Sequence, residues 1–295
     1  MKRIMTWAVS MASLLAGTAQ AQLSEYGIEG MGVVSTRDTE IRASVAPDGQ
    51  RIVWSSDRDG GTGGRDLWQA TLRDGRWIGA SPLPVNSPAD DIDPFFSADG
   101  RWLYFASNRS GGIGGDDLYR AAVLADGGLG TAENLGPAIN TRGDERAPTL
   151  SRDGQRLLFA GDGHGGAGGH DLFVARWHGG AFVAPQPLAG INTARGELEA
   201  AWLEDGRALV FARAGDPAIG AIQLHLAHCR DGDWRDAQPL ALSFNTAEAI
   251  TRAPVVDANK PSELLVTGSA RAPKAGKLDI YRMRAPSSDG NDSCR

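Results

Sequence analysis

The sequence predicts an all-β fold: a single five-bladed β-propeller with four strands in each blade. Three separate sequence markers recur along the chain with steps of 51 to 54 residues. Short segments rich in β-branched and aromatic residues, separated by turn residues, fill each period, and no stretch carries a sustained helical periodicity. Four short strands in a repeat of this length are typical of a propeller blade.

The three markers are a turn, the start of a strand and a second kind of turn. Asp-Gly turns begin at Asp48, Asp99, Asp153 and Asp205. An Asp-Leu-aromatic triplet begins at Asp66, Asp117 and Asp171, and Asp279 opens a similar triplet two periods further on. The second turn begins at Asn86, Asn140, Asn192 and Asn245. Because independent markers share one period, they indicate a structural repeat.

The repeats begin near Glu40, Asp91, Glu145, Glu197 and Ile250, which gives five blades, and the fifth has only three strand-like segments. Residues 35–40 resemble residues 140–145, which end one repeat and begin the next. We therefore predict that the N-terminal segment supplies the outer strand of the fifth blade. Such a closure removes an open sheet edge, which would otherwise invite mispairing.

The two ends of the chain are expected to lie outside the propeller, which we place at residues 22–284. Lys2 and Arg3, an apolar run over 4–16 and Ala19-Gln20-Ala21 have the pattern of a secretory signal peptide at residues 1–21. This predicts a periplasmic or secreted protein. The run is shorter than the roughly 20 apolar residues that span a bilayer, and no later stretch is as apolar, so we expect no membrane span. Residues 285–295 are polar and are expected to form a flexible tail.

Charge and cysteine content narrow the functional classes. Without its two basic signal residues the chain goes from a formal charge of −6 to −8 (−6 − 2), and an acidic protein is a poor ligand for nucleic acid. Cys229 and Cys294 both lie in the exported part. They form either a disulfide that holds the tail, or one buried and one exposed thiol, and the sequence leaves both open. Two cysteines so far apart do not predict a metal site.

Residues 97–119, S-A-D-G-R-W-L-Y-F-A-S-N-R-S-G-G-I-G-G-D-D-L-Y, resemble the WD40-like Pro-Asp repeat. That repeat is found in the TolB propeller and in periplasmic propellers of outer-membrane-associated proteins. The resemblance implies a protein-interaction propeller at the bacterial cell envelope. The chain shows no counterpart of the N-terminal domain of TolB or of a peptidoglycan-binding module, which argues against a Tol–Pal role.

Glycine-rich runs at 60–64, 111–115 and 165–169 join the second and third strands of three blades. Glycine allows tight loops because it reaches positive φ without steric cost. A phosphate cradle would need a following helix, whereas a strand is expected here. The aspartate that opens each third strand is expected to accept hydrogen bonds from loop amides, with calcium binding as the alternative.

One set of candidate site residues consists of carboxylates that stand just before the innermost strand of four blades. They are Glu40, Asp91, Glu145 and Glu197. Fivefold geometry should bring them toward the rim of the central channel. There they could hold each blade to its turn, bind a cation, or serve as acid and base of a glycosidase, which needs carboxyl groups about 5 to 9 Å apart. We favour the structural role, because a residue repeated in every blade rarely catalyses at one point.

The other set lies in the loops of the same face: Arg58, Asn108, Arg109 and His164. The arginines could grip a partner's carboxylate with both nitrogens, or form ion pairs with neighbouring acids. We predict a monomeric, non-catalytic scaffold that binds an envelope protein and needs no cofactor or metal. The alternative is a propeller that binds or hydrolyses a glycan with the channel carboxylates.

Overall fold

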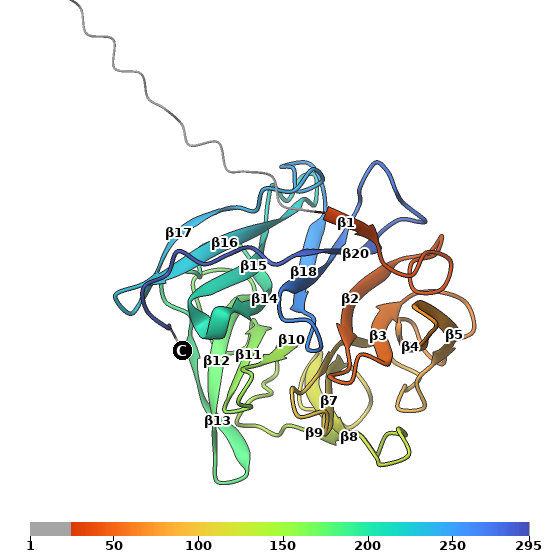
Figure 1. The fold of residues 1–295 in the computed structure, drawn as a ribbon. Helices are drawn as coiled ribbons and strands as arrows, with labels where there is room; N and C mark the ends of the chain where they lie inside the picture. Colours follow the sequence, from red (N-terminus) through yellow and green to blue (C-terminus); the bar gives the residue numbers. More distant parts are fainter. Residues whose placement is uncertain (1–24, 295) are drawn as a thin grey trace, which may run out of the picture.

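The computed structural model describes residues 25–294, and these form five four-stranded antiparallel sheets arranged in a ring (Figure 1). The prediction of a five-bladed, all-β propeller is confirmed. The predicted signal peptide lies outside the described residues. Within the described part, no helix is long and apolar enough to cross a membrane.

Each of the first four blades is built from four consecutive strands, from the innermost outward. Blade 1 contains β2 (Glu40–Val45), β3 (Arg51–Ser56), β4 (Asp66–Arg73) and β5 (Arg76–Pro82). Blade 2 contains β6 (Asp91–Phe96), β7 (Trp102–Ser107), β8 (Asp117–Ala122) and a short β9 (Glu133–Asn134). Blade 3 contains β10 (Glu145–Leu150), β11 (Arg156–Gly161), β12 (Asp171–His178) and β13 (Ala181–Pro187). Blade 4 contains β14 (Glu197–Leu203), β15 (Ala208–Ala214), β16 (Ile222–Arg230) and β17 (Asp233–Pro239), with a 3-10 turn, η1 (Glu204–Gly206), after β14.

Blade 5 is assembled from both ends of the chain. Its strands β18 (Thr251–Val256), β19 (Glu263–Gly268) and β20 (Asp279–Arg284) are completed on the outside by β1 (Glu25–Ile28). The β1 strand runs antiparallel to β20, with Ile28 opposite Tyr281. The predicted closure is confirmed, and it covers the edge that β20 would otherwise expose.

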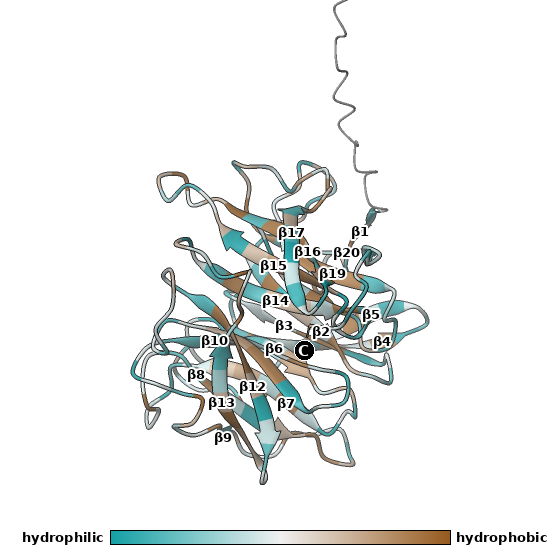
Figure 2. Cartoon of the chain, turned by 90° about the vertical axis from the view of Figure 1, so that its left-hand side faces the viewer, coloured by the Kyte–Doolittle hydropathy of each residue, from teal (hydrophilic) through white to brown (hydrophobic). Residues whose placement is uncertain are grey.

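The core lies between neighbouring blades, where the apolar faces of adjacent sheets meet. The aromatic residue of each Asp-Leu-aromatic triplet, and its counterpart Tyr281, is at most 6 % exposed: Trp68, Tyr119, Phe173 and Tyr281. Figure 2 shows that apolar (brown) stretches lie along the strands and that the same strands also carry polar (teal) stretches. Each innermost strand also carries a β-bulge near its start. A bulge bends a strand and redirects side chains, and at this place it lies beside the propeller axis.

The C-terminal segment differs from the flexible tail that the sequence led us to expect. Cys229 at the end of β16 forms a disulfide with Cys294, so the paired alternative is the one observed. The Asn291 amide donates to the Cys229 carbonyl at 3.1 Å, and the Cys294 amide donates to the Gly206 carbonyl at 3.1 Å. Residues 288–294 are therefore fastened to blade 4, because hydrogen bonds and a covalent bond outweigh their polar composition.

Candidate functional site

All predicted site residues lie at one face of the propeller, which we call the glycine-loop face. It consists of the loops between second and third strands (57–65, 108–116, 162–170, 215–221 and 269–278) and the turns before the innermost strands (35–39, 86–90, 140–144, 192–196 and 245–250). The Asp-Gly turns lie at the opposite face, because successive strands of a blade alternate in direction.

Each turn is fixed to the third strand of the preceding blade by one side chain. In blade 1 the Asn86 amide group accepts from the Leu67 amide and donates to the Leu67 carbonyl, both at 3.0 Å. The same bracket joins Asn140 to Leu118, Asn192 to Leu172 and Asn245 to Leu224. Ser35 replaces asparagine in the N-terminal segment and exchanges hydrogen bonds with Ile280. The asparagine marker of the sequence is thus a structural bracket.

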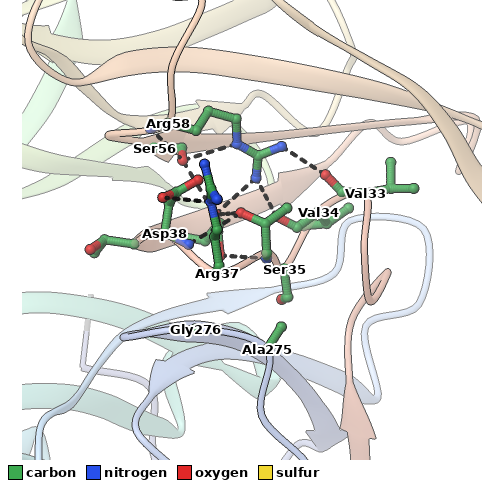
Figure 3. A network of polar contacts seen from close by, with 12 residues as sticks. Val33, Val34, Ser35, Arg37, Asp38, Ser56, Arg58, Ala275 and Gly276 are labelled. Atoms are coloured by element: carbon green, nitrogen blue, oxygen red, sulfur yellow. Dashed lines mark hydrogen bonds and ion pairs between the residues drawn. The ribbon is translucent and has the colours of Figure 1, made fainter.

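The first predicted carboxylate, Glu40, is completely buried and fully engaged. It accepts from the Thr36 amide at 2.9 Å, from the Thr36 hydroxyl at 2.7 Å and from Arg58 Nη2 at 2.9 Å. Burial raises the pKa of Glu40, while the Thr36 and Arg58 contacts oppose that rise. Figure 3 shows how Arg58 reaches into this network.

Arg58 joins three parts of the structure around this carboxylate. Its guanidinium donates to the Val33 and Val34 carbonyls at 2.8 and 2.6 Å. It also stacks on Trp54 and Trp68, with 5.1 Å from the guanidinium carbon to each ring centre. We call this arrangement of turn, buried carboxylate, cation and aromatic rings a carboxylate–cation node.

Two other blades repeat the node with arginine. In blade 2 Asp91 accepts from Ser87 and Arg109, and Arg109 also donates to the Val85 carbonyl and stacks on Phe105 and Tyr119. In blade 4 Glu197 accepts from Thr193 and Arg213, and Arg213 donates to the Ile191 carbonyl and stacks on Phe211. Both carboxylates are completely buried.

Blade 3 has histidine where these blades have arginine. Nε2 of His164 lies 2.7 Å from the Ile139 carbonyl oxygen and 3.6 Å from Oε1 of Glu145. The imidazole packs against Phe159 and Phe173, with ring centres 5.4 and 5.0 Å away. Burial raises the pKa of Glu145 to about 6, with Thr141 opposing the rise.

Blade 5 has an uncharged version of the node. Thr251 takes the place of the carboxylate, and its hydroxyl donates to the Phe244 carbonyl at 2.9 Å. The Phe244 ring packs on Tyr281 with a centre-to-centre distance of 4.8 Å, close to Gly268. An aromatic ring therefore fills the space that an arginine occupies elsewhere.

Three members of the second set thus lie beside carboxylates of the first set inside the nodes. The side chains of Arg58, Arg109 and His164 are only 10, 17 and 15 % exposed, so their polar groups face the protein. Asn108 accepts from the Asp90 amide at 2.9 Å and so ties its loop to the neighbouring turn. Sequence reasoning missed Arg213, which lies on β15 itself and not in the loop that follows. Its position two residues after Phe211, the counterpart of Trp54 in blade 1, was the available signal.

The channel itself holds a charged group that the sequence analysis did not single out. Arg42 of blade 1 is completely buried, and its Nη2 donates to the Pro148 carbonyl and the Thr149 hydroxyl of blade 3 at 2.7 and 2.8 Å. Burial lowers the pKa of Arg42, and nearby carboxylates oppose that effect. Glu199 of blade 4 accepts from Arg252 Nε of blade 5 at 2.6 Å. These side chains link opposite and adjacent blades across the axis.

The aspartates that open the third strands hold the glycine-rich loops, as predicted. Asp66 accepts from the Thr62 and Gly63 amides at 2.9 and 3.1 Å. Asp117, Asp171 and Asp279 accept from loop amides in the same way. Gly61 and its counterparts are required because a Cβ there would overlap the aspartate.

One group of described side chains comes close enough to share a metal ion: Asp144, Asp162 and His170, whose ligand atoms lie within 4.8 Å of one another. Asp144 already accepts from Arg146 Nη2 at 2.8 Å and from the Asp116 amide at 2.9 Å. A guanidinium bound to the central carboxylate repels a second cation. We therefore assign the group to a hydrogen-bonded ion-pair network.

Two cavities among the described residues lie away from the four carboxylates. One of about 530 Å³ lies between blades 5 and 1 and is lined by residues that include Glu29, Leu72, Trp77 and Arg282. Another of about 480 Å³ lies between blade 4 and the C-terminal segment and is lined by residues that include Glu204, Arg207 and Asp292. Neither is lined by a node residue.

Comparison with known proteins shows which solved structures share the fold but does not show an activity. No family model and no curated protein matches the sequence. Among solved structures, TolB from Acinetobacter baumannii is 12 % identical with a TM-score of 0.52, and the alignment covers 90 % of this chain and 64 % of that one. Putative TolB from Agrobacterium tumefaciens is 12 % identical with a TM-score of 0.54 and covers 90 % and 100 %. The catalytic domain of an α-L-arabinofuranosidase from Coprinopsis cinerea is 11 % identical with a TM-score of 0.54 and covers 91 % and 99 %.

These similarities show a propeller fold shared with TolB, and at such identities they show the fold alone. The chain spans a little under two thirds of the length of the first TolB. Because protein-binding propellers and glycosidases have the same architecture, function has to be argued from the site.

Proposed function

We propose that this protein is a non-catalytic scaffold of the bacterial cell envelope that binds a protein partner with its glycine-loop face. The supporting observation is that the polar side chains repeated from blade to blade bind one another inside the protein. Four buried carboxylates, with an arginine beside three of them and a histidine beside the fourth, hold the turns of this face. The face is therefore rigid, and its turn tips form the contact surface. Preorganised surfaces bind with a smaller entropy cost.

The exposed tips offer groups suited to a protein. Arg37, which is 85 % exposed, and the exposed Arg142 and Arg195 lie in the turns of three blades. Ile113 and Ile219, 40 and 55 % exposed, lie at the tips of two loops. An arginine fork recognises carboxylates, and exposed apolar side chains supply contact area. The partner is expected to present acidic side chains beside apolar ones.

Export also has structural support. The Cys229–Cys294 disulfide is of a kind that persists in oxidising compartments such as the periplasm. It agrees with the signal-peptide pattern of residues 1–21. The protein is proposed to act in the periplasm or outside the cell.

A glycan-hydrolysing propeller is the second candidate, favoured by the fold shared with arabinan-degrading enzymes and by the raised pKa of Glu145. A glycosidase acid must reach the glycosidic oxygen and its partner the sugar ring. The four node carboxylates are completely buried and hydrogen-bonded to their turns, so they are not accessible to a bound sugar. The scaffold is therefore the better supported function.

The test is a pull-down from envelope extract with the exported form as bait. One variant carries Arg37→Ala, Arg142→Ala and Arg195→Ala on the glycine-loop face. The matched control carries Arg73→Ala, Arg101→Ala and Arg152→Ala, which are exposed near the opposite face.

A purified partner that binds wild type and the control equally, and the first variant at least about tenfold more weakly, supports the proposal. Equal binding by both variants would reject this face. Hydrolysis of arabinan by wild type, abolished by Glu145→Gln, would establish the glycosidase instead.

A further inference from the structure

Blade 3 is the one blade of the described structure whose node contains a titratable cation site. Arg58, Arg109 and Arg213 each donate to a backbone carbonyl just before the turn and to the buried carboxylate, and each lies over at least one aromatic ring. His164 occupies the same niche, against the Ile139 carbonyl, Glu145 and two phenylalanines. Arginine stays charged at all physiological pH values, whereas histidine as a residue type changes its charge between pH 5 and 8.

This exchange leaves the blade 3 node short of one positive charge whenever the imidazole is neutral. The 2.7 Å contact with a carbonyl oxygen requires that Nε2 of His164 carry a proton even when the ring is neutral. A neutral ring cannot balance the charge of Glu145, 3.6 Å away. The arginine nodes, by contrast, pair one carboxylate with one guanidinium.

The surroundings do not supply the missing charge. The titratable and charged groups that face the pair from neighbouring elements are Asp116, Asp117, Asp144, Arg146, Asp162 and His170. Arg146 is engaged by Asp116 and Asp144, and Nε2 of His170 lies 3.8 Å from Asp144. Aspartates therefore dominate the field at Glu145.

We propose that the Glu145–His164 pair is a proton switch: when the pH falls from neutral to about 5, the pair takes up one proton, and the buried negative charge of Glu145 is no longer left without a compensating charge. The loop over residues 162–170 then closes more tightly on the turn over residues 140–144. The switch acts on one blade of the glycine-loop face and leaves the arginine nodes unchanged. It operates whatever the face binds.

The contacts explain how the uptake of one proton affects both the turn over residues 140–144 and the loop over residues 162–170. The Thr141 amide and hydroxyl donate to Glu145, and the Thr141 hydroxyl also accepts from the Gly143 amide at 3.0 Å. Gly163 lies so close that a Cβ there would overlap Thr141. Asp162 accepts from the Asp144 amide at 2.7 Å. Turn and loop therefore share the groups that respond to the charge of Glu145.

The direction follows from the proton affinity of the pair. Burial first, together with Asp117 and Asp162, raises the pKa of Glu145 from 4.5 to about 6. The closed form thus binds the proton more tightly than an opened form does. Its extra stability is complete below about pH 4.5 and is lost as the pH rises through about 6. The proton belongs to the pair as a whole and not to one residue.

The experiment is amide hydrogen exchange of the exported protein at pH 5.0 and 7.5, with rates corrected for intrinsic exchange. Peptides covering 139–170 in blade 3 are compared with peptides covering 85–116 in blade 2 of the same molecule. We expect protection of the blade 3 peptides to fall on the order of eightfold between the two pH values, and that of blade 2 by less than twofold.

Two variants exchange the switch between blades. His164→Arg should remove the pH dependence from blade 3, and Arg109→His should confer it on blade 2. Equal pH responses of the two blades in wild type would overturn the proposal, as would a blade 3 response that survives in His164→Arg. The wild-type comparison decides by itself if a variant does not fold.

Discussion

The arginine nodes make a quantitative prediction for Arg58→Met. Methionine keeps an apolar stem over Trp54 and Trp68 but removes the guanidinium from Glu40, which is completely buried. Breaking a buried ion pair from one side costs about 3 to 5 kcal/mol, because the remaining charge has no compensation. We expect that loss in the free energy of unfolding, measured in urea at pH 7.5 by tryptophan fluorescence.

An exposed pair of the same chemistry provides the control. Arg101 lies 2.6 Å from Asp99, with the side chains 78 and 44 % exposed, so Arg101→Met should cost at most about 1 kcal/mol. Adding Glu40→Gln to Arg58→Met should recover about 2 kcal/mol, since the buried charge is gone. Lowering the pH should also shrink the cost of Arg58→Met, because burial already raises the pKa of Glu40 and the variant raises it further. The reasoning fails if Arg58→Met and Arg101→Met lower stability equally.

Three further predictions concern the closure, the tail and the pH dependence. Removing residues 22–39 deletes β1 and the salt bridge between Glu29 and Arg282 at 2.5 Å. The cooperative thermal transition, followed by circular dichroism, should then be lost. An unchanged melting curve would contradict the closure. Cys294→Ser opens a link across 65 residues and should cost about 4 kcal/mol in urea unfolding, with no further loss when reductant is added. Between pH 5 and 7.5 the wild type should lose about 1 kcal/mol more of its free energy of unfolding than Glu145→Gln does. The reason is that the pKa of Glu145 is raised to about 6, so the stability gained from its bound proton vanishes above that pH. Equal pH profiles of the two proteins would show that Glu145 does not titrate in this range.

The fold could be predicted because its signals are local and repeated. An Asp-Gly turn, an asparagine bracket and an Asp-Leu-aromatic strand each act within one blade or between neighbours, so each repeat carries a complete copy. The closure was also predictable, since residues 35–40 match the end of a repeat. The tail was not, because its fastening depends on Cys229 and on carbonyl groups of blade 4 that lie far away in the sequence.

The site was predicted residue by residue but not as pairs. Glu40 and Arg58 were recognised as repeated positions, yet the 2.9 Å contact between them depends on how loop and turn fold back on the same strand end. Arg42 could not be found from the repeat, because its counterparts in other blades are Asp93, Ala147, Glu199 and Ala253 and share no chemistry. Channel residues meet across the axis, so their partners are set by the ring and not by the repeat.

The uncharged node of blade 5 is best explained by how that blade is closed. In the other blades the carboxylate and the arginine or histidine beside it belong to one continuous repeat, and they hold a turn that comes directly before the innermost strand. Blade 5 has to hold an outer strand from the opposite end of the chain. The ion pairs of blade 5 lie beside this outer strand. Arg282 on β20 contacts Glu29, just after β1, at 2.5 Å, and also contacts Asp257 and Glu263, each at 2.6 Å. Glu29 and Asp257 raise the pKa of Arg282 against the effect of burial, so the pairing stays charged. In the blades where the chain is continuous, the buried ionic contact therefore stabilises the turn before the innermost strand. In blade 5 it stabilises the contact between the two ends of the chain.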